Sequence, residues 1–260
     1  MSIDPKVIDG RVEPARFSRL TYEHFRSMAE DSTLSANEKI GMPDATRLGF
    51  DESILADILP KLPSLARRGH TVVDIGSGCG TFAHHFIAYC RKLEHSLLLV
   101  DSQEMLKHLP DCPGVSKVEG RFPANERLIT EQIPKGADVV IVYGVLSVVF
   151  ADSNPFLFLD RAAALLQSGG HLLVGDVPNA SKLRRFLATD AGVRYHREYL
   201  RTEEAPRLDV FESPTDRIDD GVVLGIIDRM RRRGFDAYVV PQSESLPLAN
   251  RREDILIVRP

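Results

Sequence analysis

The pattern of hydrophobic and polar residues changes near residue 70. From there, short apolar runs rich in β-branched residues alternate with segments in which apolar residues recur every three or four positions. The short runs are typical of strands buried on both faces of a sheet, and the recurring pattern is typical of helices with one buried face. Strands are predicted at 71–75, 96–100, 115–119, 138–142, 171–175, 237–240 and 254–258, and helices at 81–93, 103–109, 125–132, 154–166 and 219–233.

Strands that alternate with helices pair in parallel through right-handed crossovers. The chain is therefore predicted to have an α/β fold with a doubly wound, Rossmann-like sheet of seven strands. A loop rather than a helix joins the last two strands, so the sheet is expected to be mostly parallel with a reversed last strand. This domain is expected to span 66–260, and residues 178–217, which fit no regular part of the pattern, are expected to form an inserted substrate lobe.

The segment before the alternation, residues 1–65, is predicted to be a helical extension. Amphipathic patterns at 17–29 and 51–59 predict two helices, and a polar stretch with helix-breaking residues lies between them. Extensions of this kind often form lids over a site. We therefore expect residues 30–47 to help cover the site.

Composition and charge narrow the class of protein. The chain has 260 residues, a net charge of −4 and a pI near 6.1, which does not favour nucleic acid as a partner. The basic run Arg231–Arg233 closes a predicted helix, where cations suit the negative end of the helix dipole. Cys79, Cys90 and Cys112 form no CxxC pair, so neither a disulfide framework nor a zinc site is indicated.

The sequence gives no indication of a membrane partner. The longest weakly charged apolar run, 137–151, is shorter than the roughly 20 residues that a spanning helix needs. The first residues, MSIDPKVIDG, lack the apolar core of a signal peptide. We therefore expect a cytoplasmic protein whose partner is a small molecule, and a homodimer is compatible with the sequence.

A glycine-rich turn follows the first predicted strand in the segment TVVDIGSGCGT. Gly76, Gly78 and Gly80 stand at alternate positions, which allows a sharp turn and lets a ligand approach the backbone. The dinucleotide fingerprint is instead G-x-G-x-x-G, with a pyrophosphate at the helix N-terminus. Asp74 would repel a pyrophosphate but would suit a ligand with an ammonium and a sulfonium centre. The alternative is a plain turn between a strand and a helix.

A second carboxylate stands at the end of the second predicted strand, in Val100-Asp101-Ser102. At this edge of an open α/β sheet, Asp101 can accept hydrogen bonds from both ribose hydroxyls of a nucleoside. Its alternative role is to cap the helix that follows. The pairing of Asp101 with Asp74, one strand–helix unit apart, favours the binding role.

From about residue 70 to 176, the chain resembles the class I S-adenosylmethionine (SAM)-dependent methyltransferases. Their fifth strand is preceded by a turn similar to LLQSGG, and their final strands form a reversed hairpin like the one expected here. The resemblance implies that SAM is the cofactor, and the leading hypothesis for the acceptor is a small molecule. It assigns the amino-acid end of SAM to Asp74, Gly76, Ser77 and Gly78, the ribose to Asp101, the adenine to Ser102 and Met105, and the methionine part to Tyr143 and Gly144.

The chain departs from this family after the third strand, where an acidic residue often meets the adenine amino group. Gly120, Arg121 and Phe122 stand there instead. A backbone group near Arg121 and Phe122 is the expected replacement. Three other strings, TLSANEKIGMPD, GDVPNASKLRRF and NRREDILIVRP, are similar to methyltransferases of bacterial sugar and surface-polysaccharide synthesis, which points to O- or N-methylation of a sugar or nucleotide-sugar.

Methyl transfer needs a base only when the acceptor loses a proton. His196 is a candidate base because its unperturbed pKa lies near neutral pH, and packing or surface exposure is its alternative role. Asp176 would orient an acceptor hydroxyl or cap the next segment, and Tyr143 would close over the reacting atoms. No metal site is expected.

Several cations near the expected site have two alternative roles. Lys39, Arg47, Lys182, Arg184 and Arg185 would either hold a phosphate or carboxylate of the acceptor or lie on solvated helix faces. Two other functions stay open from the sequence. One is a methyltransferase-like scaffold or partner subunit without activity, and the other is an NAD(P)-dependent oxidoreductase.

Overall fold

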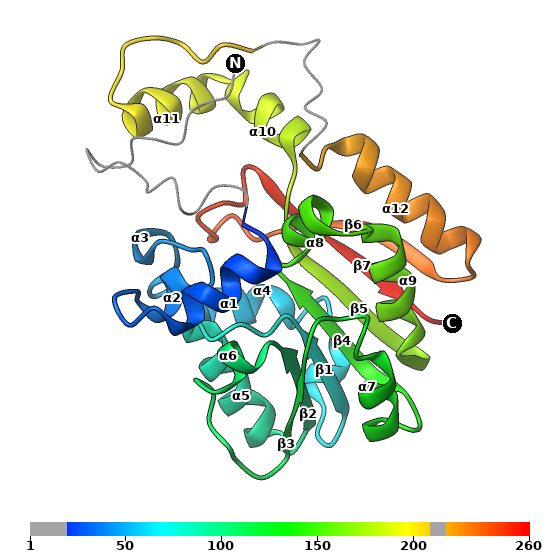
Figure 1. Ribbon diagram of the computed structural model, residues 1–260. Helices are drawn as coiled ribbons and strands as arrows, with labels where there is room; N and C mark the ends of the chain where they lie inside the picture. The colour runs from blue at the N-terminus through cyan, green and yellow to red at the C-terminus, as the bar shows by residue number, and fades with distance from the viewer. Residues whose placement is uncertain (1–19, 209–216) are drawn as a thin grey trace.

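A seven-stranded sheet in the order β3-β2-β1-β4-β5-β7-β6 forms the centre of the molecule (Figure 1). The computed structural model describes residues 20–208 and 217–260. β7 runs antiparallel to β5 and to β6, and the other neighbouring pairs are parallel. The strands are β1 (Thr71–Ile75), β2 (Ser96–Asp101), β3 (Val115–Glu119), β4 (Ala137–Tyr143), β5 (Leu166–Pro178), β6 (Asp236–Pro241) and β7 (Arg252–Val258).

This sheet confirms the predicted α/β fold, and each predicted strand is present. The reversed strand β7 lies between β5 and β6, and β7 and β6 form an antiparallel pair at one edge of the sheet. The amino end of β7 therefore meets the carboxyl end of β5, where Arg252 pairs with Pro178.

Helices cover both faces of the sheet and bury two separate cores. Residues of β1 divide between the cores, with Val73 and Ile75 in one and Val72 in the other, as a strand buried on both faces requires. One face is covered by α7 (Glu126–Gln132), α8 (Leu146–Asp152), α9 (Pro155–Ala164) and α12 (Asp220–Arg232). The other is covered by α4 (Asp51–Ile58), η2 (Pro63–Ala66), α5 (Thr81–Lys92) and α6 (Gln103–Leu106).

Two boundaries after β4 differ from the sequence expectation. β5 begins at Leu166, earlier than the predicted residue 171, because Leu166 already pairs with Ala137 across a register shift. The apolar run 137–151 contains β4, which ends at Tyr143, and then most of α8, a helix that was not predicted. An apolar run without polar residues carries no helical period, so periodicity does not separate the strand from the helix.

The segment before the sheet contains four helices within residues 20–65. These are α1 (Tyr22–Glu30), α2 (Ala36–Lys39), α3 (Asp44–Arg47) and α4, so the expected helices near 17–29 and 51–59 are present with shifted ends. Residues 17–19 lie outside the described chain. α2 was missed, although its capping box is visible in the sequence, since Ser35 caps Glu38 and Glu38 bonds back to Ser35.

The insertion after β5 contains α10 (Ala180–Leu187) and α11 (Asp190–Leu200), which lie above the carboxyl ends of the strands (Figure 1). Residues 209–216 of the insertion lie outside the described chain. Among the described residues, no helix is long and apolar enough to cross a membrane, and no group of His, Cys, Asp or Glu residues is arranged to hold a metal ion.

Candidate functional site

A cavity of about 810 Å³ opens at the carboxyl ends of β1, β2, β4 and β5. Its lining includes nine of the residues that the sequence predicted to be functional and that stand at these strand ends or just after them. They are Asp74, Gly76, Ser77, Gly78, Asp101, Tyr143, Gly144, Asp176 and, after β3, Arg121. The parallel sheet brings them together because equivalent strand ends share one edge.

The glycine turn after β1 is held by its own backbone and by Asp101. Gly76 has φ +77° and Gly78 has φ +62°, a region that favours glycine. The Gly78 N–H donates to Oδ2 of Asp101 at 2.8 Å, and the Ser77 hydroxyl donates to the carbonyl of Asp74 at 3.0 Å. The turn and the second carboxylate therefore form one unit.

The carboxylate of Asp74 is buried and that of Asp101 is half-buried, and the two are close enough for their charges to interact. Burial raises the pKa of Asp74 to about 7, and the charge of Asp101 adds to the rise. Burial also raises the pKa of Asp101 to about 6, although the N–H groups of Gly78 and Ser102 favour its charged form. No cationic side chain of the described residues offsets either charge. This arrangement fits a cationic ligand.

Of the residues expected around an adenine, three line the cavity and Ser102 does not. Met105, Arg121 and Phe122 line the cavity, whereas the Ser102 hydroxyl accepts from the Met105 N–H and caps α6. Arg121 pairs with Asp152 at 2.9 Å and lies over the ring of Tyr22, 5.4 Å from its centroid. Tyr22 also lines the cavity and was not singled out from the sequence.

The far side of the cavity is built around Tyr143, at the end of β4. Its ring lies against β5, where a Cβ at Gly175 would come within 2.3 Å of the ring. Burial holds the pKa of the phenol well above its usual range, and the charge of Asp176 adds to this effect. At neutral pH Tyr143 is therefore a hydrogen-bond donor and a packing surface, not a base.

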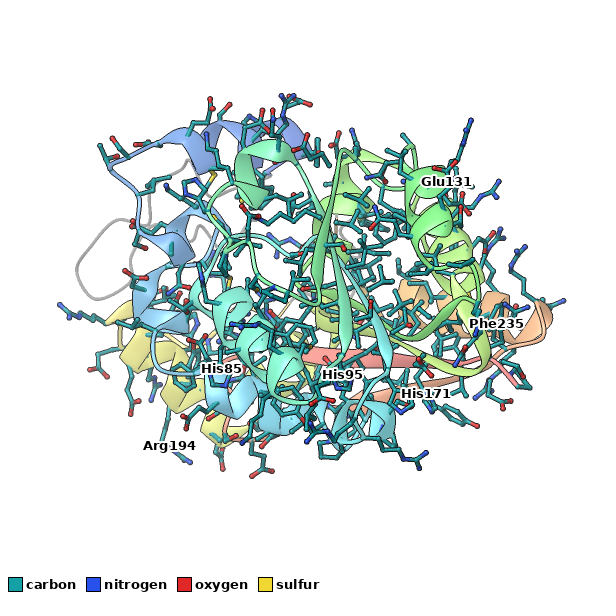
Figure 2. The ribbon with its side chains drawn as sticks, turned by 90° about the horizontal axis from the view of Figure 1, so that it is seen from below. His85, His95, Glu131, His171, Arg194 and Phe235 are labelled. Atoms are coloured by element: carbon teal, nitrogen blue, oxygen red, sulfur yellow. The ribbon has the colours of Figure 1, made fainter. Side chains whose placement is uncertain are left out.

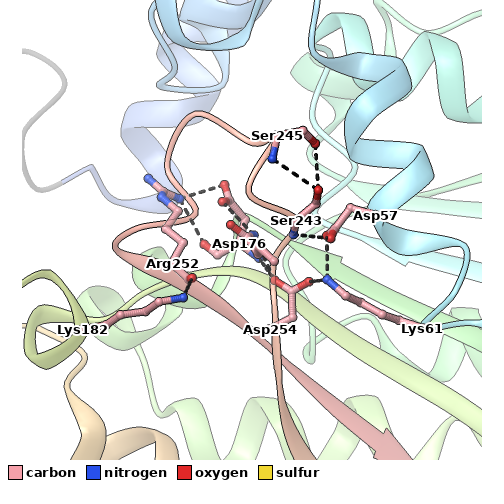
Figure 3. Close-up of polar contacts among 9 residues, drawn as sticks. Asp57, Lys61, Asp176, Lys182, Ser243, Ser245, Arg252 and Asp254 are labelled. Atoms are coloured by element: carbon pink, nitrogen blue, oxygen red, sulfur yellow. Dashed lines mark hydrogen bonds and ion pairs between the residues drawn. The ribbon is translucent and has the colours of Figure 1, made fainter. Parts of the chain in front are cut away.

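Asp176 is held in an unusual backbone conformation, with φ +59°. Its carboxylate Oδ2 accepts from Nη1 of Arg252 at 2.8 Å, and its N–H donates to the buried Asp254 at 2.8 Å (Figure 3). A non-glycine residue at positive φ costs free energy, so its neighbours must hold it in place. The strain and the exposure to the cavity together favour a functional role for Asp176.

The contacts of Asp254 extend this arrangement to the N-terminal helices. Asp254 bonds to Nζ of Lys61 at 2.7 Å, and Lys61 bonds to Asp57 at the end of α4 at 2.6 Å (Figure 3). The side chain of Asp254 is completely buried. This network connects α4 with the strand end that carries Asp176.

The histidines are not brought to the cavity in the described chain. His196 lies on α11 and is not a lining residue, so the structure does not place it with Tyr143 and Asp176. Figure 2 labels His85 on α5, His95 just before β2 and His171 on β5, and these also lie outside the lining.

Some of the cations near the site have structural partners. Lys182 donates to the carbonyl of Arg252 at 2.6 Å, and Arg185 pairs with Asp220 on α12. Lys39 is not a lining residue, whereas Arg47 and Arg184 are. Lys182 and Arg185 therefore have structural partners, whereas Arg47 and Arg184 face the cavity, where an anionic group of the acceptor could bind.

Three further arginines of the lining, Arg207, Arg217 and Arg252, were not singled out from the sequence. The signal that identifies Arg252 was present, because a reversed last strand must begin at the carboxyl edge of the sheet. Arg207 and Arg217 carry no comparable signal, since they stand in the irregular part of the insertion.

No protein-family model matches the chain, and no curated protein matches its sequence. Solved structures do match. The plantazolicin methyltransferase BpumL, in complex with S-adenosylhomocysteine (SAH) and a triazolic desmethylPZN analog, has a TM-score of 0.55 and 12% identity, covering 92% of this chain and 96% of its own. The N-methyltransferase NodS from Bradyrhizobium japonicum, in complex with SAH, has a TM-score of 0.53 and 12% identity, covering 92% and 98%.

A second plantazolicin methyltransferase, BamL, has a TM-score of 0.54 and 14% identity, covering 92% of this chain and 96% of its own. At such identities the likeness shows the fold alone. The chain therefore has the class I SAM-dependent methyltransferase fold, with its strand order and its antiparallel seventh strand.

Proposed function

We propose that this protein is a SAM-dependent methyltransferase that acts on a small-molecule acceptor. The observation that carries the proposal is the pair of carboxylates, the buried Asp74 and the half-buried Asp101, beside a glycine turn in one large cavity. SAM has an ammonium group, a sulfonium centre and a ribose diol, and these groups match the two carboxylates. The solved structures with SAH and the same fold support the same ligand class.

The described residues fit SAM in three places. Asp101 is already bonded to two backbone N–H groups, and its carboxylate has lone pairs left for the two ribose hydroxyls. Asp74 faces the cavity without a cation of its own, which suits the amino-acid end of SAM. Met105 and Phe122 supply apolar surface for the adenine.

When bound, SAM supplies a methyl group that is already activated by the sulfonium, so the protein acts mainly by positioning the acceptor. Tyr143 and Asp176 line the acceptor side of the cavity. Asp176 orients a hydroxyl or amine of the acceptor through its fixed carboxylate, and Tyr143 shields the reacting atoms from water. The segment 30–47 helps to cover the glycine turn, since Ile40 lies against Gly78 and Gly80.

For the acceptor, we propose a sugar or nucleotide-sugar that is methylated on oxygen or nitrogen. The strings around residues 33–44, 175–186 and 250–260 support this class, and they include Asp176, Arg184 and Arg252 of the cavity. BpumL and BamL are complexed with desmethylPZN analogs, so acceptors of that kind belong in the same assay.

Calorimetry tests the proposal directly. We expect SAM and SAH to bind to the purified protein and NAD⁺ not to bind, because the two carboxylates repel a pyrophosphate. Transfer of a labelled methyl group to a panel of sugars and nucleotide-sugars then tests catalysis. Binding of NAD⁺ alone would favour the oxidoreductase, and tight SAM binding without transfer to any acceptor would favour the scaffold.

The affinity for SAM is expected to depend on pH. Because Asp74 has a pKa of about 7 without ligand, it must lose a proton to face a cation. We expect the affinity to be nearly constant above pH 7 and to fall by up to about tenfold per pH unit below it. Below pH 6 Asp101 also takes up a proton, so the fall becomes steeper.

Calorimetric titrations with SAM across this pH range measure the effect. Asp74→Asn is the matched variant, because the amide keeps the shape of the side chain and does not titrate. It should bind SAM more weakly at pH 8 and lose the fall that begins near pH 7. An affinity that rises as the pH falls would contradict a binding role for the ionised Asp74.

A further inference from the structure

The acceptor side of the cavity is basic. Five arginines line it, and we call them the arginine wall: Arg47 on α3, Arg184 on α10, Arg207 and Arg217 in the insertion, and Arg252 at the start of β7. Asp176 is the acidic residue among the described lining residues on this side.

Arg47 is the most informative residue of the arginine wall. It is only 8% exposed, and its guanidinium lies 5.7 Å from the ring centroid of Phe82 and 5.5 Å from that of Tyr143. Its Nε is buried and has no hydrogen-bond partner among the described residues. A buried N–H donor without a partner costs free energy, so an anionic group that accepts from the Nε of Arg47 would be stabilised in the cavity.

Arg252 also has a buried Nε without a partner among the described residues, although another nitrogen of its guanidinium is bonded. Its Nη1 donates to the carboxylate and the carbonyl of Asp176, at 2.8 and 3.0 Å (Figure 3). Guanidinium groups bind carboxylates and phosphates through two parallel N–H donors, and Arg252 retains donors beyond those that hold Asp176.

We propose that the arginine wall binds an anionic group, a carboxylate or a phosphate, that belongs to the methyl acceptor. The wall includes Arg47, which lies over Tyr143 at the end of β4, and Arg252, which lies where the start of β7 meets the end of β5. The donor would lie at the glycine turn after β1. One donor carboxylate does not account for arginines spread over this whole side. This inference rests on the proposed function, since it assigns the rest of the cavity to SAM.

The test titrates SAH-saturated protein with inorganic phosphate, and separately with acetate, at constant ionic strength set by chloride. The NMR signals of the arginine Nε–H groups report binding. We expect saturable binding of at least one anion, and Arg47→Gln should weaken it about 10- to 100-fold. Arg67→Gln is the matched control, because Arg67 is an exposed arginine before β1 and outside the lining.

Two outcomes overturn the proposal. In the first, Arg47→Gln binds both anions as well as the unmodified protein does. In the second, Arg47→Gln loses affinity for SAH but not for the added anions, which assigns Arg47 to the donor's own carboxylate. Arg47→Lys keeps the charge without the paired donors, so it provides a second, less disruptive variant that should weaken anion binding to an intermediate degree.

Competition identifies the kind of anion. Glucose 1-phosphate and glucuronate each carry one anionic group, and glucose carries none. We expect one of the two charged sugars to displace the bound anion and glucose to leave it bound. The sugar that displaces the anion shows whether the wall prefers a phosphate or a carboxylate. The titration is repeated without SAH to separate the two proposals. If the protein binds the anions but does not bind SAH, the proposed function is refuted, whereas anion binding by the arginine wall still stands.

Discussion

Asp101→Ala is expected to lower the affinity for SAH by at least about 100-fold. Two ribose hydroxyls lose charged hydrogen-bond acceptors, and each such bond contributes about 1.5–3 kcal/mol. The substitution also removes the acceptor of the Gly78 N–H, so the glycine turn loses its contact with β2. Both effects act on binding of the donor, before any acceptor is involved, and calorimetry with SAH measures them.

Asp111→Ala is the matched control, since that carboxylate is 94% exposed and lies in the loop before β3. It should leave the affinity for SAH unchanged. Asp101→Asn keeps one carbonyl oxygen and should lie between the control and the alanine variant. If Asp101→Ala folds and binds SAH within a few-fold of the unmodified protein, the ribose is held elsewhere and the proposed site is wrong.

Lys61→Met is expected to destabilise the fold by about 3–5 kcal/mol. The methionine fills a similar volume but leaves the buried carboxylates of Asp57 and Asp254 without their cation, and these side chains are 4% and 0% exposed. Burial already raises the pKa of Asp254 even with Lys61 present. The loss should therefore be largest at high pH and shrink as the pH falls and the carboxyl groups take up protons.

Urea unfolding at two pH values measures this loss. Lys107→Met serves as the control, because Lys107 pairs with Glu30 on the surface, where the side chains are 46% and 61% exposed. Such a pair contributes about 1 kcal/mol or less. Equal losses in the two variants would show that the buried network has no special weight in the stability.

The sequence predicts well what depends on local pattern. Alternating strands and helices predicted the sheet, and the rule that strand ends share an edge brought Asp74, Asp101, Tyr143 and Asp176 to one cavity. These residues stand directly at strand ends, so an error of one or two residues in the strand boundaries does not move them away from that edge.

Features that depend on packing between distant segments were not predictable in the same way. His196 was considered for its intrinsic pKa, but its place on α11 is decided by how the insertion folds back. Of the cations around the site, Arg47 faces the cavity and Arg185 pairs with Asp220, although both looked equivalent as charges in the sequence. Only the tertiary arrangement separates them.

The contact between Ile40 and the glycine turn has a consequence for how this sequence can change over time. Gly80 does not have a positive φ, and a Cβ there would lie 2.6 Å from Cδ1 of Ile40 and 3.3 Å from Oδ1 of Asn37. α2 and its C-cap residue Ile40 therefore help to require a glycine at this position. Among relatives, positions 40 and 80 should covary, with alanine at 80 accompanied by a smaller residue at 40.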